Sequence, residues 1–223
     1  LFNIVDLGWD QELLQKFGVL ESMLPEVLPS AGDFGQTEKS ILHHSIPITA
    51  VCGDQQSALF GQCCFERGQM KNTYGTGAFL LLNTGSRPVF TKEPLLTTIA
   101  WQINGHVTYA LEGSVFACGS IINWMRDEMG IIEKPGETDD LAKSLDSNQG
   151  VYFVPAFSGL GAPYWDPQVR GTILGLSQGS GQESFVRAGL EAIAHQTTDV
   201  FEAMRKGSRL EPKQIRVDGG VSC

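Results

Sequence analysis

Short glycine turns between strand-like runs are the feature that most constrains how this chain folds. Residues 70–74 and 78–83 read as β-strands separated only by Gly75-Thr76-Gly77, which predicts a tight antiparallel hairpin. A second hairpin is expected from 97–103 and 107–111, around an Asn-Gly pair. Glycine accounts for 26 of the 223 residues, which is roughly 12% against an average near 7%. Most of these glycines stand beside apolar strands, and this placement indicates backbone loops that approach a ligand closely.

The N-terminal part is expected to contain a helix, a long loop and a strand that ends at an acidic residue. The helix is predicted over 10–17, which begins with an N-cap aspartate and is followed by a glycine. Residues 25–47 are rich in Pro, Gly and Ser and are expected to form loops and short turns. The β-branched run 46–52 predicts a strand that delivers Asp54 at its carboxyl end, followed by a helix over 55–62. Such a strand end is where α/β folds place catalytic groups.

The C-terminal half is expected to contain two helices and two further strands. Short strands are predicted over 151–157 and 215–217, an aromatic-rich loop over 159–167 and a long helix over 182–206. The inward residues of that helix are expected to be Val186, Leu190, Ile193, Thr197, Phe201 and Met204. An earlier helix is predicted from the apolar stripe Val115, Cys118, Ile122, Met125 and Met129.

Composition excludes several functional classes. Sixteen Lys and Arg against 25 Asp and Glu give a net charge of −9, which rules out the basic surface of a nucleic-acid-binding protein and a polybasic membrane patch. No apolar run reaches the roughly 18–20 residues of a membrane span, so no stable membrane insertion is expected. Neither a protein-held metal site nor the Gly-x-Ser-x-Gly elbow of a hydrolase is supported. The odd number of cysteines, without paired spacing, indicates a reduced, cytoplasmic compartment; they are Cys52, Cys63, Cys64, Cys118 and Cys223.

Two glycine elements are candidates for phosphate binding. The amides and the threonine hydroxyl of Gly75-Thr76-Gly77 suit phosphate oxygens, although an ordinary hairpin turn explains the same three residues. Asp218-Gly219-Gly220 follows a predicted strand, which is the geometry of a nucleotide contact at a helix N-terminus. Glycine turns after strands are also common, so each element alone leaves both interpretations open.

Asp54 is a candidate general base, and Gly119 with Asn123 is a candidate contact for a flat ligand. A carboxylate at a strand end can accept a proton from a substrate hydroxyl; the alternative is that Asp54 caps the following helix. Gly119 and Asn123 lie one helical turn apart, so the glycine permits close approach and the amide can recognise a polar edge. The alternative is a solvated helix face with a packing glycine. His106 and His195 are expected at the surface.

Combined, these motifs resemble the glycerol kinases, a branch of the FGGY family of carbohydrate kinases. The resemblance covers essentially the whole chain in the same order and is strongest from Gly53 onward. It rests on GDQQSALFGQ (53–62), KNTYGTGAFLLLNTG (71–85), LLTTIAW (95–101), YALEGSVFACGSIINWMRD (109–127), GVYFVPAFSGLGAPYWDPQVRGTILGL (150–176) and RVDGG (216–220).

The resemblance implies an α/β, actin-like and Hsp70-like ATPase fold, with a ribonuclease-H-like core in each half and the active site in the cleft between the halves. Residues 1–61 correspond to the end of the family's N-terminal domain, and 62–223 to a truncated C-terminal domain. The implied reaction transfers the γ-phosphoryl group of MgATP to glycerol and yields sn-glycerol 3-phosphate and ADP. Glycerol and ATP are the expected partners and ATP/ADP and Mg²⁺ the expected cofactors. The full-length enzyme is expected to be a cytoplasmic homo-oligomer.

The resemblance also assigns roles to single residues. Asp54 matches the general base at the attacking hydroxyl, with Gln55 also near the polyol, and Phe79 matches an aromatic side chain that packs on the glycerol carbons. The positions that match nucleotide contacts are Thr76 at the phosphates, Gly119 and Asn123 beside the adenosine, and Gly220 around ADP.

Two departures from the family pattern matter. Asn123 stands where the family usually has Gln, which is one methylene longer, so a weaker adenine contact is expected. The chain opens without methionine and stops just after Asp218-Gly219-Gly220, so it is expected to be a fragment without the upstream phosphate and glycerol contacts, inactive in isolation. Two alternatives remain: a kinase for another polyol or ketose, and a non-catalytic nucleotide-binding fragment.

Overall fold

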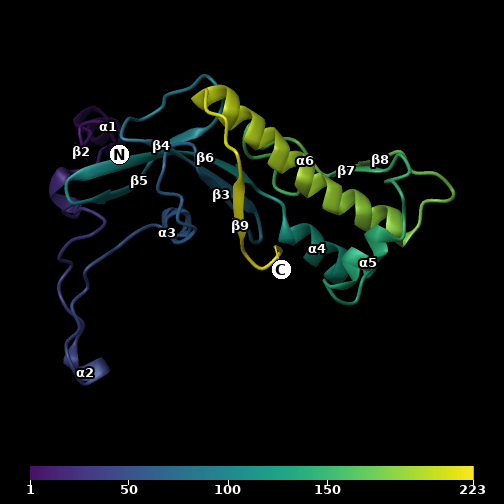
Figure 1. Cartoon of the computed structure of the whole chain (residues 1–223), viewed down its shortest axis with the longest axis horizontal. Coiled ribbons are helices and arrows are strands. Elements are labelled where there is room, and N and C mark those ends of the chain that lie inside the picture. Colours follow the sequence, from purple (N-terminus) through teal and green to yellow (C-terminus); the bar gives the residue numbers. More distant parts are fainter. Residues whose placement is uncertain (223) are drawn as a thin grey trace.

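A five-stranded mixed sheet forms the centre of the computed structural model, which describes residues 1–222 (Figure 1). The strand order is β5-β6-β4-β3-β9. The four strands from β5 to β3 are antiparallel to their neighbours, whereas β9 runs parallel to β3. The bounds are β3 Met70–Tyr74, β4 Ala78–Gly85, β5 Leu96–Ile103, β6 His106–Val115 and β9 Ile215–Asp218.

The two faces of the sheet are covered by different helices. On one face, α4 (Gly119–Asp127) and α6 (Gln182–Ser208) pack against alternate residues of β4, including Leu80 and Leu82. On the other face, α3 (Asp54–Gly61) packs through Leu59 against Leu81, the intervening residue of β4. Alternation along a strand directs successive side chains to opposite faces, so this strand is buried on both sides.

Most of the elements expected from the sequence are confirmed. Both hairpins form, with Tyr74 paired to Ala78 across the first turn and Ile103 paired to His106 across the second. Helix α1 (Gln11–Phe17) has Asp10 as its N-cap, whose carboxylate accepts a 3.0 Å hydrogen bond from the amide of Leu13. Helix α6 is the expected long helix, and the residues expected on its inward face are buried or packed against the core. His106 and His195 are exposed, as expected.

The prediction of a strand over 46–52 is wrong. This segment instead forms one side of an irregular two-stranded arm with residues 30–37, held by single bridges such as Ala31–Ala50 and by the 3.0 Å hydrogen bond from the Phe34 amide to the Ile48 carbonyl. The arm carries the short helix α2 (Lys39–Leu42) at its far end (Figure 1). Its β-branched residues lack a continuous ladder, and Pro47 has no amide hydrogen to donate.

The prediction of a helix from the stripe Val115 to Met129 is also partly wrong, because the helix is shorter at both ends. Val115 is the last residue of β6, where it pairs with Ala78, and Met129 lies beyond the end of α4 and is 44% exposed. The strand expected over 151–157 is shorter, as β7 covers Tyr152–Val154 and pairs with β8. The elements that the sequence pattern did not predict are β1 Phe2–Asn3, β2 Gly8–Trp9, η1 Glu21–Met23, α2 Lys39–Leu42, α5 Glu137–Lys143 and β8 Thr172–Leu174.

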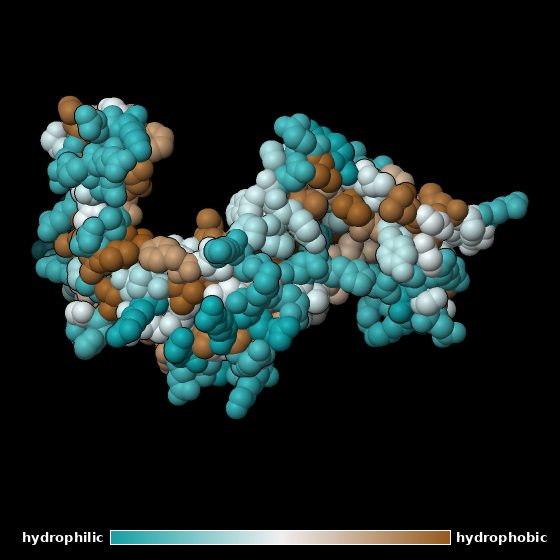
Figure 2. Space-filling model, turned by 90° about the horizontal axis from the view of Figure 1, so that it is seen from above, coloured by the Kyte–Doolittle hydropathy of each residue, from teal (hydrophilic) through white to brown (hydrophobic). Residues whose placement is uncertain are grey.

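Apolar side chains remain exposed at both ends of the molecule. Figure 2 shows them on the left, where the N-terminal segment and the arm lie, and again on the right. Phe17, Ile41 and Phe60 are exposed by 69%, 74% and 41%, and Leu174 by 55%. Within residues 1–222, no helix has the length and apolar character needed to cross a bilayer. Cys223 lies outside the described residues.

Candidate active site

A surface cleft of about 740 Å³ brings together four residues that the sequence predicted to contact a nucleotide. Thr76 comes from the β3–β4 turn, Gly119 and Asn123 from the first turns of α4, and Gly220 from the turn after β9. Thr76, Asn123 and Gly220 are exposed to solvent, whereas Gly119 is buried. Three separate chain segments thus converge on one cleft through the fold of the sheet. Other residues that line it are Ile122, Pro135, Gly136, Thr138, Asp139, Leu190 and Val221.

The start of α4 rests directly on the β3–β4 turn. The amide of Gly119 donates a 2.9 Å hydrogen bond to the carbonyl oxygen of Gly75, and the amides of Cys118 and Ser120 donate to the carbonyl oxygen of Thr76. A Cβ atom at Gly119 would lie 2.7 Å from the Gly75 oxygen. Gly119 is therefore required for packing between the helix and the turn. This agrees with the alternative from the sequence in which Gly119 is a packing glycine.

The turn after β9 is fastened to both β3 and α3. A Cβ atom at Gly219, whose φ is +93°, would lie 2.3 Å from the carbonyl oxygen of Tyr74, whereas Gly220 has open space around it. Gln62, directly after α3, donates a 2.8 Å hydrogen bond to Oδ2 of Asp218. Arg216 donates to the carbonyl oxygen of Gln62. The cleft wall and the end of α3 are thus parts of one packed unit.

Asp54 stands at the first position of α3 and is exposed. Gly53, not Asp54, is the N-cap residue of this helix, so the capping alternative for Asp54 is wrong. The Asp54 carboxylate accepts from Gln55 twice: Oδ1 from the backbone amide at 2.8 Å and Oδ2 from the side-chain amide at 3.4 Å. The two hydrogen bonds fix the position of the carboxylate, and its exposure lets a bound hydroxyl reach it and give up a proton to it.

Lys71 is the residue near Asp54 that sequence reasoning missed. It lies in β3 on the face covered by α3, its side chain is 0% exposed, and its ammonium donates to Oε1 of Gln55. Burial lowers the pKa of Lys71 to about 8, against the opposing influence of Asp218, Glu112 and Asp54. A lysine in a strand ordinarily indicates a solvent-facing position, so no signal in the sequence marked this one.

The β3–β4 hairpin links the polyol-contact candidates to the nucleotide cleft. Phe79 is half-buried in β4, and its carbonyl oxygen accepts a 3.1 Å hydrogen bond from Lys71. Phe79 is the third residue after Thr76, so at most about 10 Å of chain lies between the two residues. The hairpin therefore joins the end of the cleft at Thr76 to the strand residue that Lys71 contacts, and Lys71 in turn contacts Gln55.

Two models of protein families match the chain. Residues 1–61 match the N-terminal domain of the FGGY family of carbohydrate kinases, and residues 70–223 match the C-terminal domain of the same family. This chain belongs to the FGGY family. The expected α/β kinase fold is thereby confirmed, whereas the domain division at residue 61 and the roles of the site residues stay predictions.

The FGGY chain is most informatively compared with three relatives. It is 54% identical over its whole length to a curated glycerol kinase of Caldanaerobacter subterraneus subsp. tengcongensis and 55% identical to one of Pseudothermotoga lettingae. A crystal structure of Plasmodium falciparum glycerol kinase with ADP superposes on all of the chain with a TM-score of 0.89 at 38% identity. The chain spans about 45% of the length of each of these proteins.

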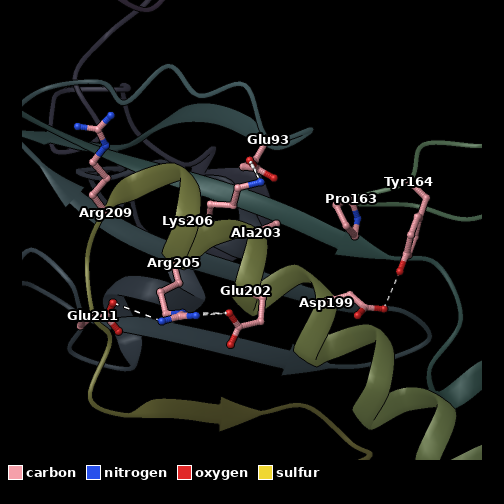
Figure 3. A pocket seen from close by; sticks show the side chains of 10 residues that line it. All are labelled: Glu93, Pro163, Tyr164, Asp199, Glu202, Ala203, Arg205, Lys206, Arg209 and Glu211. Carbon is pink, nitrogen blue, oxygen red and sulfur yellow. Dashed lines mark hydrogen bonds and ion pairs between the residues drawn. The ribbon is translucent and has the colours of Figure 1, made fainter.

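A second cleft of the FGGY chain, of about 510 Å³, contains none of the predicted site residues (Figure 3). It runs along the C-terminal half of α6, where Tyr164 donates a 2.9 Å hydrogen bond to Asp199 and Lys206 lies 2.7 Å from Glu93. Arg205 pairs with Glu202 and Glu211. These contacts fasten α6 to the neighbouring loops. Five of the charged residues that line the cleft are paired with one another: Glu93, Glu202, Arg205, Lys206 and Glu211.

Proposed function

We propose that this chain is the part of a glycerol kinase that holds the nucleotide and supplies the catalytic base. The observation that carries the proposal is the convergence of Thr76, Gly119, Asn123 and Gly220 on one cleft. The β3–β4 hairpin that borders this cleft also carries Lys71, which donates to Gln55, the neighbour of Asp54 in α3. The substrate is inferred from identity above 50%, over the whole chain, to curated glycerol kinases.

In the proposed reaction, Asp54 accepts the proton of the terminal glycerol hydroxyl as its oxygen attacks the γ-phosphorus of ATP. The new O–P bond forms while the bond from the γ-phosphorus to the β–γ bridging oxygen breaks, so the products are sn-glycerol 3-phosphate and ADP. Gln55 keeps the Asp54 carboxylate in place, and Phe79 packs on the glycerol carbons. Phosphoryl transfer depends mainly on such positioning and on neutralisation of charge.

On the nucleotide side, Thr76 contacts the phosphates, Gly220 borders the diphosphate, and Asn123 contacts the adenosine. Three of these positions are exposed toward the cleft, so a ligand reaches them without rearrangement of the core. Their arrangement on a turn, a helix start and a second turn is typical of nucleotide sites.

Mg²⁺ is proposed as the ion that accompanies ATP, because it neutralises phosphate charge when bound. Among residues 1–222, no group of three or more His, Cys, Asp or Glu side chains is arranged to hold a metal. Mg²⁺ usually keeps several waters and binds through one or two carboxylates plus substrate phosphates. An ion held chiefly by the ATP phosphates and by water fits a chain of this kind without a dedicated ligand group, and it leaves Asp54 free to act as the base.

The proposal is tested by ADP release from the full-length protein with MgATP and a panel of glycerol, other polyols and ketoses. Turnover with glycerol well above the rest is the expected result. Turnover only with another polyol or a ketose overturns the proposed substrate and retains the proposed mechanism. Nucleotide binding without turnover of any acceptor overturns the catalytic proposal. The same preparation, analysed by sedimentation, tests the further proposal that the full-length enzyme is a homo-oligomer.

A further inference from the structure

Lys71 makes three hydrogen bonds inside the protein and none of its side chain is exposed. Its ammonium donates to Oε1 of Gln55 at 2.5 Å, to Oγ1 of Thr73 at 2.8 Å and to the carbonyl oxygen of Phe79 at 3.1 Å. An ammonium has three N–H groups, so each of them has an acceptor. Lysine is rarely buried completely, because removing its charge from water is costly. The cost indicates that this position requires an ammonium.

The contact with Gln55 determines how Gln55 faces Asp54. The side-chain amide of glutamine has one accepting oxygen and one donating nitrogen. Because Lys71 holds the oxygen, the nitrogen of Gln55 is left to face Oδ2 of Asp54, 3.4 Å away. Without Lys71, the oxygen of Gln55 loses its donor, so the side chain is no longer anchored in the position that places its nitrogen beside Oδ2 of Asp54.

Charges on three other elements face the same ammonium. Asp218 at the end of β9, Glu112 of β6 and Asp54 of α3 all favour its protonated form, in the order given, and the Cys64 thiol contributes least. Lys71 therefore connects the helix that carries Asp54 with three strands of the sheet. One of the hydrogen bonds of Lys71 fixes the backbone carbonyl of Phe79. The aromatic side chain of the same residue is the proposed contact for the glycerol carbons.

We propose that Lys71 is a positioning residue that acts through Gln55 to orient the Asp54 carboxylate toward the acceptor hydroxyl. The inference rests on the proposed function, since it assumes that Asp54 is the base. The competing explanation is that Lys71 only balances the buried charges of Asp218 and Glu112 and stabilises the fold. The two explanations differ in whether the effect of Lys71 on turnover passes through Gln55.

A double-mutant cycle on the full-length protein separates them. We expect Lys71→Met and Gln55→Leu each to lower kcat about 10- to 100-fold, because small displacements of a catalytic group have effects of this size. The double variant is expected to be no slower than the slower single variant, since both changes break the same chain of contacts. Effects on kcat that multiply in the double variant overturn the inference. Lys16→Met, which replaces an exposed lysine paired with Glu12, is the control and leaves kcat unchanged.

Gln55→Glu provides a variant that keeps the Lys71 contact if Lys71→Met does not fold. The new carboxylate accepts from Lys71 but offers no N–H to Asp54. We expect a Tm at least equal to that of the wild type together with a kcat about 10- to 100-fold lower. A kcat equal to that of the wild type overturns the inference.

If the wild type does not phosphorylate glycerol, the proposed function is contradicted but the inference about Lys71 is not. The double-mutant cycle is then measured with the panel substrate that the protein does phosphorylate. Crystal structures of the wild type and of Lys71→Met, or of Gln55→Glu where Lys71→Met does not fold, give a readout that is independent of substrate. In Lys71→Met, the Gln55–Asp54 side-chain contact is expected to be lost; in Gln55→Glu, the Asp54 carboxylate is expected to turn away from its wild-type position. An unchanged contact in Lys71→Met, or an unmoved Asp54 carboxylate in Gln55→Glu, overturns the inference whatever the substrate is.

Discussion

The amide of Gly119 lies 2.9 Å from the carbonyl oxygen of Gly75, so the first residue of α4 is hydrogen-bonded to the turn between β3 and β4. A methyl group at Gly119 would meet that oxygen at 2.7 Å and Val221 Cγ2 at 3.0 Å. Both contacts are shorter than side chains ordinarily tolerate. One wall of the candidate nucleotide cleft thus depends on the absence of a side chain at Gly119.

Gly119→Ala is accordingly expected to lower the free energy of unfolding by about 1–3 kcal/mol. It is also expected to raise the KM for ATP, because Thr76 moves with the turn. Urea unfolding and initial rates measure the two effects. Gly8→Ala is the control, since nothing lies within 4 Å of the added methyl group and no positive φ is involved. A Gly119→Ala protein with wild-type stability and KM contradicts the prediction.

Asp54→Asn is expected to lower kcat about 10²- to 10⁴-fold, which is the usual contribution of a general base. Because Asp54 is exposed and outside the core, Tm is expected to change little. Asp146→Asn, at another exposed aspartate, controls for the loss of one negative charge. Turnover of Asp54→Asn within a few-fold of the wild type contradicts the assignment of the base.

Asn123→Gln is expected to lower the KM for ATP about 2- to 10-fold at unchanged kcat. The longer side chain reaches one methylene further into the cleft from an exposed position on α4. One added hydrogen bond contributes about 0.5–1.5 kcal/mol, which corresponds to this range. Asn123→Ala changes KM in the opposite direction if the amide contacts the nucleotide. Equal KM values for all three proteins show that this side chain does not contact it.

Lys71 makes the free energy of unfolding depend on pH in the alkaline range. Its pKa is lowered from 10.5 to about 8, so between these values the unfolded chain binds a proton that the folded chain does not. Stability rises with pH wherever the unfolded state binds more protons. The free energy of unfolding of the wild type minus that of Lys71→Met is therefore expected to increase from pH 8 to pH 10.5, by on the order of 3 kcal/mol. Urea unfolding across that range measures it, and a flat difference contradicts the lowered pKa.

The sequence predicted those elements whose signals are local. The hairpins follow from glycine turns between apolar runs. The helix α6, which is 27 residues long, follows from its helical stripe of inward residues. The segment 46–52 has the composition of a strand, yet its neighbour in space is the irregular stretch 30–37, and composition does not identify the partner of a strand. Val115 has the spacing of the α4 stripe but belongs to the ladder with β4.

The residues of the candidate site likewise fall into those that a local motif marks and those that only a tertiary contact explains. Asp54, Thr76 and Gly220 stand in motifs with a recognisable chemistry, and the fold brings Thr76 and Gly220 to one cleft. Lys71 could not be found, because its burial arises from the packing of α3 on this face of the sheet, which is a tertiary contact that strand composition does not show. The contact that explains Gly119 is likewise a tertiary one.

The hydrogen bond between Gln62 and Asp218 joins residues 156 positions apart and ties the end of α3 to the turn that carries Gly220. The separation between the proposed base and the proposed phosphate contacts is therefore a fixed dimension of this part of the fold. A descendant that adopts a longer acceptor cannot gain room by sliding α3 along the sheet, because the turn after β9 would move with it. New specificity has to come from side chains that surround Asp54, with the catalytic spacing inherited unchanged.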